Sequence, residues 1–265
     1  MAAGVLLQVA YDGRPFSGFA RQDNARTVAG ELLGAVRALD PSASELRGTS
    51  RTDAGVHARA QLVAFDAALD IPPRGWVLGL SRHLPSEIAV VRAVTVPLGF
   101  EPRRHVRNKT YRYLLLESAV RDPFLEGRVW RLGHRLNQMA MADAAAPLVG
   151  EHDFAAFRAS GDERTETVRR LVRVEVRRAR SDARVLEIVV EGDRFMYKMV
   201  RIIVGALVDV GRGRRAANCT SLALSSRDRT DLGITAPPDG LYLDSIELDA
   251  DLNDAWPVDG IDLSP

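Results

Sequence analysis

The residues best suited to chemistry lie at positions 50–58, which read Ser-Arg-Thr-Asp-Ala-Gly-Val-His-Ala. Asp53 follows Arg51 by two positions and precedes Gly55 by two. A neighbouring arginine favours the ionised form of a carboxylate, and an ionised, oriented carboxylate is a competent nucleophile or base. Gly55 permits a tight turn or the close approach of a ligand. Residue types alone still favour a simpler interpretation, a turn in which Asp53 caps backbone N–H groups.

The composition limits the class of protein. A chain of 265 residues fits one large domain or two small ones, and a hydrophobic fraction of 46% allows a substantial core. Cys219 is the single cysteine, which excludes a disulfide within the chain and a cysteine-rich zinc site. No segment resembles a signal peptide, and no apolar run approaches membrane-spanning length. We expect a soluble, cytoplasmic protein.

The net charge of +1 conceals an uneven distribution. Eight acidic residues and no lysine or arginine follow position 238, so the first 238 residues hold 36 basic and 27 acidic side chains, a net charge of +9. All but two of the basic residues are arginine, whose planar fork of donors suits phosphate. The pattern is compatible with a nucleic-acid partner. It is equally compatible with a GC-rich genome that encodes arginine at positive surface positions.

Hydrophobic periodicity predicts strands and helices in both halves of the chain. Thr27 is suited to cap a helix whose apolar residues recur at helical spacing over 28–39. Further helices are expected at 75–82, 136–149 and 195–210, the second of them with Pro147 in its last turn. Strands are expected at 5–11, 61–65, 88–96, 110–116, 172–176, 185–191 and 241–248.

Because each half mixes strands and helices, we predict an α+β architecture of two similar lobes. The N-terminal lobe is expected at 1–105 and carries the loop of Asp53. The C-terminal lobe is expected at 106–248, followed by an acidic C-terminal tail at 249–265.

The string at 50–58 resembles the catalytic loop of the TruA family of tRNA pseudouridine synthases. In that family the aspartate of Arg-Thr-Asp-Ala-Gly-Val-His is the catalytic nucleophile, and it corresponds to Asp53. A nine-residue match is specific, and further family motifs follow in the same order over roughly residues 5 to 248. These motifs are Tyr11-Asp12-Gly13, Phe16-Ser17-Gly18-Phe19, residues 61–65, Leu84-Pro85, residues 109–113, residues 150–154 with Phe157-Arg158, Met199-Val200-Arg201 with Gly205, Ala236-Pro237 and residues 240–243.

The resemblance implies two related lobes whose mainly antiparallel sheets meet at a central cleft, with helices on the outer faces. It implies an isomerase that converts uridine to pseudouridine in the anticodon stem-loop of tRNA, at positions 38–40, and that works as a homodimer. The reaction breaks the N1–C1′ bond, turns the base and rejoins it through C5. It contains no redox step and no transfer between molecules, so no cofactor and no metal is expected. The sequence accordingly lacks a dinucleotide fingerprint and a Walker motif.

The resemblance also assigns roles beside Asp53. The target uridine must leave its stack, and Tyr111 corresponds to the family tyrosine that stacks on it. Tyr113 shares a strand face with Tyr111 and is better interpreted as a core aromatic. Arg51 corresponds to the arginine that helps to keep the nucleotide out of its stack, although a structural ion pair is a competing role. His57 is expected to serve loop packing or RNA contact, because a histidine need not be a catalyst.

Arg201 lies on one helix stripe with Lys198, Gly205 and Asp209, which is ordinarily a solvated stripe. The resemblance implies instead that Arg201 points into the cleft and pairs with Asp53, which would hold the carboxylate ionised and oriented.

Three basic groups are candidates for phosphate contact. The densest includes Arg103, Arg104 and Lys109, which we expect to bind substrate RNA. The second group is Arg169, Arg170, Arg173, Arg177, Arg178 and Arg180, and the third is Arg212, Arg214 and Arg215. Each group alone is more often a solvated face than a binding patch.

The sequence departs from the family pattern at Phe19, Ser81, Pro102 and Ile202, where the family usually has other residues. These departures concern RNA docking and the choice of uridine more than the reaction class. Two alternatives therefore stay open: a pseudouridine synthase for another tRNA position or RNA, and a non-catalytic RNA-binding relative. A carboxylate-pair glycosidase would require a second acid near Asp53, and none is convincingly placed.

Overall fold

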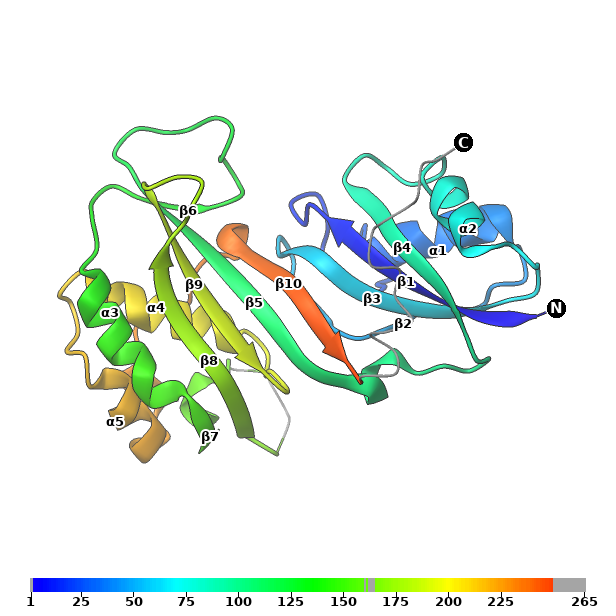
Figure 1. Cartoon of the computed structure of the whole chain (residues 1–265). Helices are drawn as coiled ribbons and strands as arrows, with labels where there is room; N and C mark the ends of the chain where they lie inside the picture. The colour runs from blue at the N-terminus through cyan, green and yellow to red at the C-terminus, as the bar shows by residue number, and fades with distance from the viewer. Residues whose placement is uncertain (1, 160, 162–164, 250–265) are drawn as a thin grey trace. The chain divides into compact units, whose positions relative to one another are not determined.

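The computed structural model describes residues 2–159, 161 and 165–249 (Figure 1). They form two compact units, the first from the described residues of Met1–Arg107 and Leu243–Pro265, the second from those of Asn108–Tyr242. The C-terminal lobe was expected to end at residue 248, whereas residues 243–249 group with the first unit. The expected acidic tail lies, from residue 250 onward, outside the described residues.

In its described residues, the first unit is an antiparallel sheet with two α-helices. It contains β1 (Ala3–Tyr11), β2 (Arg47–Gly48), β3 (His57–Ala67), β4 (Ile88–Val96) and most of β10 (Leu241–Leu248). The strand order is β4-β1-β3-β10, and the short strand β2 pairs antiparallel with β3. Helices α1 (Val28–Leu39) and α2 (Pro73–Leu80) contact each other and lie on one side of this sheet (Figure 1).

Both faces of this sheet are covered by apolar side chains. Phe65 of β3 meets Trp76 of α2 edge to face, with ring centroids 5.0 Å apart. The other face packs Leu62 and Ala64 of β3 against Phe100 and Leu248. Burial on two faces fixes the register of β3, because a slip of one residue would exchange the two sets of side chains. That register also fixes where the loop before β3 begins and ends.

Helix α1 begins where its cap predicts. The Thr27 hydroxyl accepts a hydrogen bond from Gly30 N at 3.2 Å, and Val28, Leu32 and Val36 are fully buried. A side-chain cap of this kind contributes about 1 kcal/mol. Both the cap and the buried face of α1 are confirmed.

The described part of the second unit is also a mainly antiparallel sheet, with three α-helices. Its strands are β5 (Val106–Glu117, whose first two residues belong to the first unit), β6 (Trp130–Leu132), β7 (Gly150–Asp153), β8 (Val168–Arg178) and β9 (Val185–Gly192). The order is β5-β9-β8-β7, and β6 runs parallel to β5. Helices α3 (Gln138–Ala145), α4 (Met199–Gly211) and α5 (Cys219–Ser226) gather on one face of this sheet (Figure 1). The predicted α+β class is confirmed in both units.

Three helix predictions were wrong in their bounds, and the smallest error is in α2, which begins at Pro73 and ends at Leu80. Helix α4 begins at Met199 and not at residue 195, because Lys198 has φ of +58°, a left-handed conformation that no right-handed helix contains. Helix α3 begins at Gln138, capped by the side chain of Asn137, and it ends at Ala145. A separate 3₁₀ turn, Ala146–Leu148, carries Pro147.

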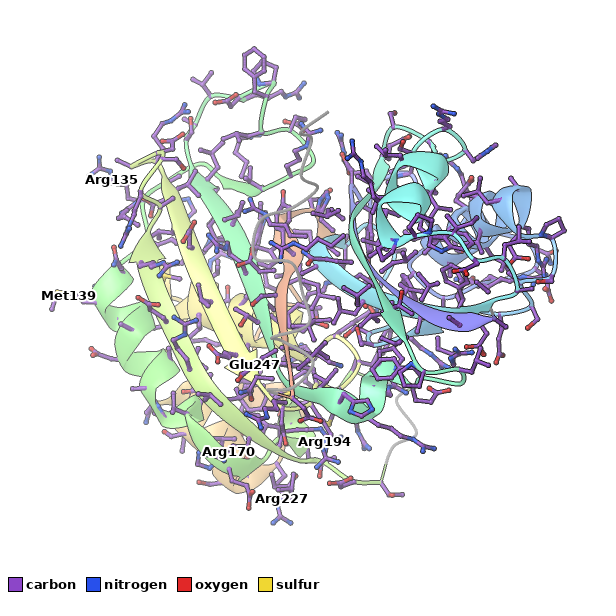
Figure 2. All side chains as sticks on the ribbon, turned by 45° about the vertical axis from the view of Figure 1, so that its right-hand side comes forward. Arg135, Met139, Arg170, Arg194, Arg227 and Glu247 are labelled. Carbon is purple, nitrogen blue, oxygen red and sulfur yellow. The ribbon has the colours of Figure 1, made fainter. Side chains whose placement is uncertain are left out.

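Helix α3 separates its two faces cleanly. Met141 is fully buried, whereas Met139 is 79% exposed and points away from the unit (Figure 2). Among the described residues, no helix is long and apolar enough to cross a membrane.

Candidate active site

Asp53 lies in the loop between β2 and β3 of the first unit, and its side chain is half-buried. The Asp53 carbonyl accepts a hydrogen bond from Val56 N at 3.2 Å, which closes a tight turn. The third residue of that turn, Gly55, has φ of +78°, a conformation that favours glycine. The same loop therefore contains both the tight turn and the Asp53 carboxylate, so the presence of a turn does not exclude a chemical role for Asp53.

Gln61 of β3 holds the start of this loop. It is fully buried, and its amide oxygen accepts hydrogen bonds from the Thr49 hydroxyl at 2.8 Å and from Ser50 N at 3.2 Å. Its amide nitrogen donates to the Ser50 carbonyl at 2.6 Å. One side chain on a buried strand thus satisfies both backbone groups of Ser50, three positions before Asp53.

A second loop, residues 12–19, lies directly against the loop of Asp53. Phe19 N donates to the Thr52 carbonyl at 3.1 Å. Gly18 has φ of +100°, and a Cβ there would lie 2.8 Å from the same carbonyl. A Cβ on Gly13 would lie 2.1 Å from the Val56 carbonyl. Such distances are shorter than contact, so both glycines are required for the two loops to meet.

His57 is buried at the end of the string, with 3% of its side chain exposed. Its Nδ1 lies 3.2 Å from Gly13 N and 3.3 Å from the Asp12 Oδ1 atom. The first contact needs an unprotonated Nδ1 and the second a protonated one, so they exclude each other. We assign Nδ1 as the acceptor, because the Gly13 N–H is buried and Asp12 already accepts hydrogen bonds from Arg14. This position favours the packing role of His57 over RNA contact.

Arg51 and Phe19 differ sharply in exposure. The Arg51 side chain is exposed and, within the part of the chain that the structure describes, it has no hydrogen bond or ion pair. Phe19 is 5% exposed, and its ring fills the space where a Cβ on Gly48 would lie, 2.5 Å from Phe19 Cε1. The departure at Phe19 is therefore a packing position beneath the loop.

Two tyrosines of β5, in the second unit, occupy different environments. Tyr111 is half-buried and meets Phe195 edge to face, with ring centroids 4.9 Å apart. Tyr113 is fully buried, and its hydroxyl donates to the Pro237 carbonyl at 2.7 Å. Burial raises the pKa of Tyr113 above its ordinary value, although the positive charge of Arg201 opposes the shift. Tyr113 is thus a structural phenol, as its interpretation as a core aromatic predicted.

Arg201 lies near the start of α4 and is half-buried. Its Nε donates to the Ala236 carbonyl at 2.8 Å, and its own carbonyl accepts from Ala236 N at 3.0 Å. The stripe that it shares with Gly205 and Asp209 is not solvated, since Asp209 is only 6% exposed.

The predicted site residues divide between the two units. The first unit holds Arg51, Asp53, His57, Arg103 and Arg104, and the second holds Lys109, Tyr111 and Arg201.

The sequence as a whole identifies the family. The model of the tRNA pseudouridine synthase family matches residues 7–103 and 144–249. The chain belongs to the tRNA pseudouridine synthase family. It is accordingly an isomerase, and its reaction is tRNA pseudouridylation.

Individual relatives extend the similarity over most of the chain. The tRNA pseudouridine synthase A of Halalkalibacterium halodurans is 39% identical over 236 residues, which cover 89% of each chain. That of Citrifermentans bemidjiense is 40% identical over 240 residues, covering 90% of this chain and 95% of the relative. A solved H/ACA ribonucleoprotein with a substrate RNA matches 77% of this chain and 44% of its own at 10% identity. Its TM-score of 0.37 is too low to support a structural argument.

In this tRNA pseudouridine synthase, the second basic group is largely neutralised by acids. Arg173 pairs with Glu191 at 2.9 Å, Arg177 pairs with Glu187 at 3.0 Å, and Arg178 pairs with Glu117. Arg169 is buried and donates to backbone carbonyls.

Exposed arginines of the second unit also differ in their pairing. Figure 2 shows Arg170, Arg194 and Arg227 at its surface, where Arg194 pairs with Glu166 and Arg227 with Asp153, each at 3.0 Å. In the third basic group, Arg212 lies 5.6 Å from the Trp130 ring centroid.

Members of the densest basic group differ as well, since Arg107 pairs with Asp249 at 3.4 Å and Arg112 with Glu187 at 3.1 Å. Arg103 and Arg104 are exposed on the 3₁₀ turn Pro102–His105, where Pro102 itself is buried. Lys109 is half-buried on β5. The other departures are packing or surface positions: Ile202 is 1% exposed in the core, and the Ser81 hydroxyl donates to the Leu78 carbonyl at the end of α2.

Sequence reasoning missed the part that Ala236 plays. Its motif, Ala236-Pro237, matched the family, but nothing local indicated that one carbonyl of the pair would bind Arg201 and the next Tyr113. The motif match was the available signal.

Proposed function

We propose that this enzyme isomerises uridine in the anticodon stem-loop of tRNA, at positions 38–40, with Asp53 as the nucleophile and without a cofactor. The support is the match of residues 50–58 to the family loop, together with relatives that are named tRNA pseudouridine synthase A. We also propose that it works in the cytoplasm, where its tRNA substrate is found.

The observation that carries the proposal is the rigid support of the Asp53 loop. Gln61 fixes the loop before Asp53, the backbone of Phe19 binds Thr52, and the turn at Gly55 closes the loop after it. A loop whose backbone is held at these three points needs little reorganisation to present the half-buried Asp53 carboxylate to a reacting atom.

The proposed chemistry balances without an added reactant. The Asp53 carboxylate attacks C1′ as the N1–C1′ bond breaks, and the freed base turns in place. C5 then attacks C1′ and the carboxylate leaves. The proton on C5 goes to solvent and N1 ends with a proton, so product and substrate are isomers.

Other side chains would hold the extruded nucleotide. Tyr111 stacks on the base, which contributes about 1–3 kcal/mol for an aromatic against a nucleobase. Arg51 and Arg201 act on the charge of the reacting nucleotide, while Arg103, Arg104 and Lys109 contact phosphates.

We propose in addition that the enzyme is a homodimer, by analogy with the family. Sedimentation equilibrium at micromolar concentration would show twice the chain mass of 29.0 kDa. A monomer of full activity under the same conditions would contradict this.

The test of the substrate position is a map of pseudouridine in tRNA from a strain that lacks this protein. We expect the loss of pseudouridine at positions 38–40 and its return when the wild-type chain is restored. Loss at another position would favour the alternative of a different target uridine. Release of tritium from C5-labelled uridine in bulk tRNA by the purified enzyme completes the test.

A further inference from the structure

Helix α4 has one stripe without large apolar side chains. Arg201, Gly205 and Asp209 follow each other at intervals of four residues, and residues so spaced lie above one another on a helix. This stripe is a shallow track along the helix, because Gly205 has no side chain to fill it.

A strap of backbone, residues 233–236, lies in that track. A Cβ on Gly233 would lie 1.9 Å from the Asp209 Oδ2 atom, and a Cβ on Gly205 would lie 1.8 Å from the Ile234 carbonyl oxygen. Ala236 exchanges two hydrogen bonds with Arg201. The strap therefore runs against the direction of the helix, one contact per turn, and ends at the guanidinium of Arg201.

Arg229 binds the strap and the residue before it through both of its terminal nitrogens. One terminal nitrogen of Arg229 donates to the carbonyls of Leu232 at 2.9 Å and Gly233 at 3.0 Å. The other donates to the Thr235 hydroxyl at 3.2 Å. Hydrogen bonds from a charged donor are about twice as strong as neutral ones, and the fork of an arginine fixes the relative positions of the groups that it binds.

The geometry of Arg201 depends on this arrangement. A guanidinium is planar, so a hydrogen bond at Nε fixes the direction in which its two terminal nitrogens point. That hydrogen bond goes to the Ala236 carbonyl, which is the end of the strap. Displacement of the strap by about 1 Å would misplace those donors, and an error of that size can cost about 100-fold in rate.

We propose that Arg229 is a positioning residue for pseudouridine formation: it fixes the 233–236 strap on α4, and the strap orients Arg201. The inference rests on the proposed function of Arg201. Arg229 itself need not touch tRNA, so its loss should change turnover and leave tRNA affinity almost unchanged.

The test compares turnover and tRNA affinity of Arg229→Gln in two backgrounds. In the otherwise wild-type enzyme we expect kcat for tritium release to fall about 10- to 100-fold, with the Kd for tRNA within about twofold. In an Arg201→Ala background the same substitution should have little further effect, because the group that it orients is gone. Equal fold losses in both backgrounds, or an unchanged kcat, would overturn the proposal.

A second pair of variants guards against simple loss of folding. Gly205→Ala pushes the strap away without touching Arg229, and it should lower kcat as Arg229→Gln does. Gly34→Ala is the matched control, since Gly34 also lies in a helix but has open space where a Cβ would be. Should Arg229→Gln fail to fold, Gly205→Ala decides: full turnover in that variant overturns the proposal.

Failure of the inference and failure of the proposed function are distinguishable. If Arg201→Ala alone keeps full turnover, the catalytic role proposed for Arg201 is wrong. If Arg201→Ala is impaired but Arg229→Gln and Gly205→Ala are not, only the positioning role is wrong.

Discussion

At the scale of the residue, the side chains around the Asp53 loop fall into those open to solvent and those that hold others in place. Arg51 is exposed and Asp53 half-buried, whereas Gln61 and His57 are buried and bind backbone of the two adjoining loops. The sequence predicted Asp53 through its motif. The sequence left the role of His57 open, because a histidine in this motif can either contact RNA or pack inside the protein. The burial of His57 favours packing.

Arg201→Ala tests the proposed division between chemistry and binding. We expect turnover of tRNA to fall far more than tRNA affinity, because one guanidinium among many basic groups adds little to binding but acts at the reacting nucleotide. Single-turnover tritium release and a filter-binding Kd measure the two effects. Equal losses in both would show that Arg201 only binds phosphate.

Asp12 gives a prediction about acid stability. Burial alone would raise the pKa of Asp12, but hydrogen bonds from the side chain and backbone of Arg14 outweigh it and lower the pKa to about 2. A carboxyl group with a lowered pKa stabilises the folded state above its ordinary value of 3.8, and that contribution is lost as the pH falls toward 2. Because Arg14 is exposed to solvent, we expect at most about 1 kcal/mol.

The measurement for Asp12 is the free energy of unfolding in urea between pH 7 and pH 3. Asp12→Asn should be less stable than wild type at pH 7, and the difference should shrink below about pH 4. Asp23→Asn, at an exposed carboxylate, is the control. A difference that stays constant with pH would contradict this account of Asp12.

At the scale of the element, the sequence predicted those helix and strand bounds that depend on neighbouring residues, such as a capping side chain or apolar spacing. Thr27 and the apolar spacing after it predicted α1, and β4 begins and ends at the predicted residues. The start of α4 could not be predicted, because the left-handed conformation of Lys198 is rare for residues other than glycine. Helix α5 was missed because its sequence, rich in serine, has little apolar periodicity.

Gln61 of strand β3 anchors the Asp53 loop, so a substitution at Gln61 should affect both stability and turnover. Gln61→Leu keeps the approximate volume but leaves the Thr49 hydroxyl and both backbone groups of Ser50 without this partner. We expect a loss of about 2–4 kcal/mol in the free energy of unfolding, because unsatisfied buried groups cost about 1–3 kcal/mol each. Turnover should fall as well, since the loop loses its anchor.

Urea unfolding and tritium release of Gln61→Leu check both effects. Gln8→Leu is the matched control, because Gln8 lies on a neighbouring strand and, among the described residues, makes a single hydrogen bond, at 3.4 Å. If the two variants behaved alike, Gln61 would not anchor the loop.

At the scale of the whole molecule, hydrophobic periodicity predicted elements along the chain, but it does not say which unit each element joins. Strand β10 from Leu243 onward joins the first unit through its pairing with β3 and the packing of Leu248. Contacts between residues so distant in sequence leave no local pattern. The pairing of charges also depends on contacts that the sequence does not show. The sequence has an excess of arginine in its first 238 residues, but only the structure shows that Arg173 and Arg177 are paired with acids.

This difference in pairing predicts which arginines bind tRNA. Affinity for tRNA should fall steeply with salt, because each phosphate contact on a single strand contributes about −0.7 to the log–log slope. Arg103→Gln combined with Arg104→Gln should weaken binding and reduce the slope by about 1 to 2. Arg173→Gln, at an arginine paired with Glu191, should change neither. Filter binding from 50 to 200 mM salt measures these effects. A larger loss of tRNA affinity in Arg173→Gln than in the double variant would contradict the proposal that Arg103 and Arg104 contact phosphates.

The most direct test of the central claim compares Asp53→Asn with Asp23→Asn in single-turnover tritium release from C5-labelled tRNA. We expect Asp53→Asn to lose at least about 1,000-fold in rate, equal to about 4 kcal/mol of activation free energy, while its Kd for tRNA changes little. Asp23→Asn should match wild type in both measurements. An Asp53→Asn enzyme that forms pseudouridine at the wild-type rate would contradict the account.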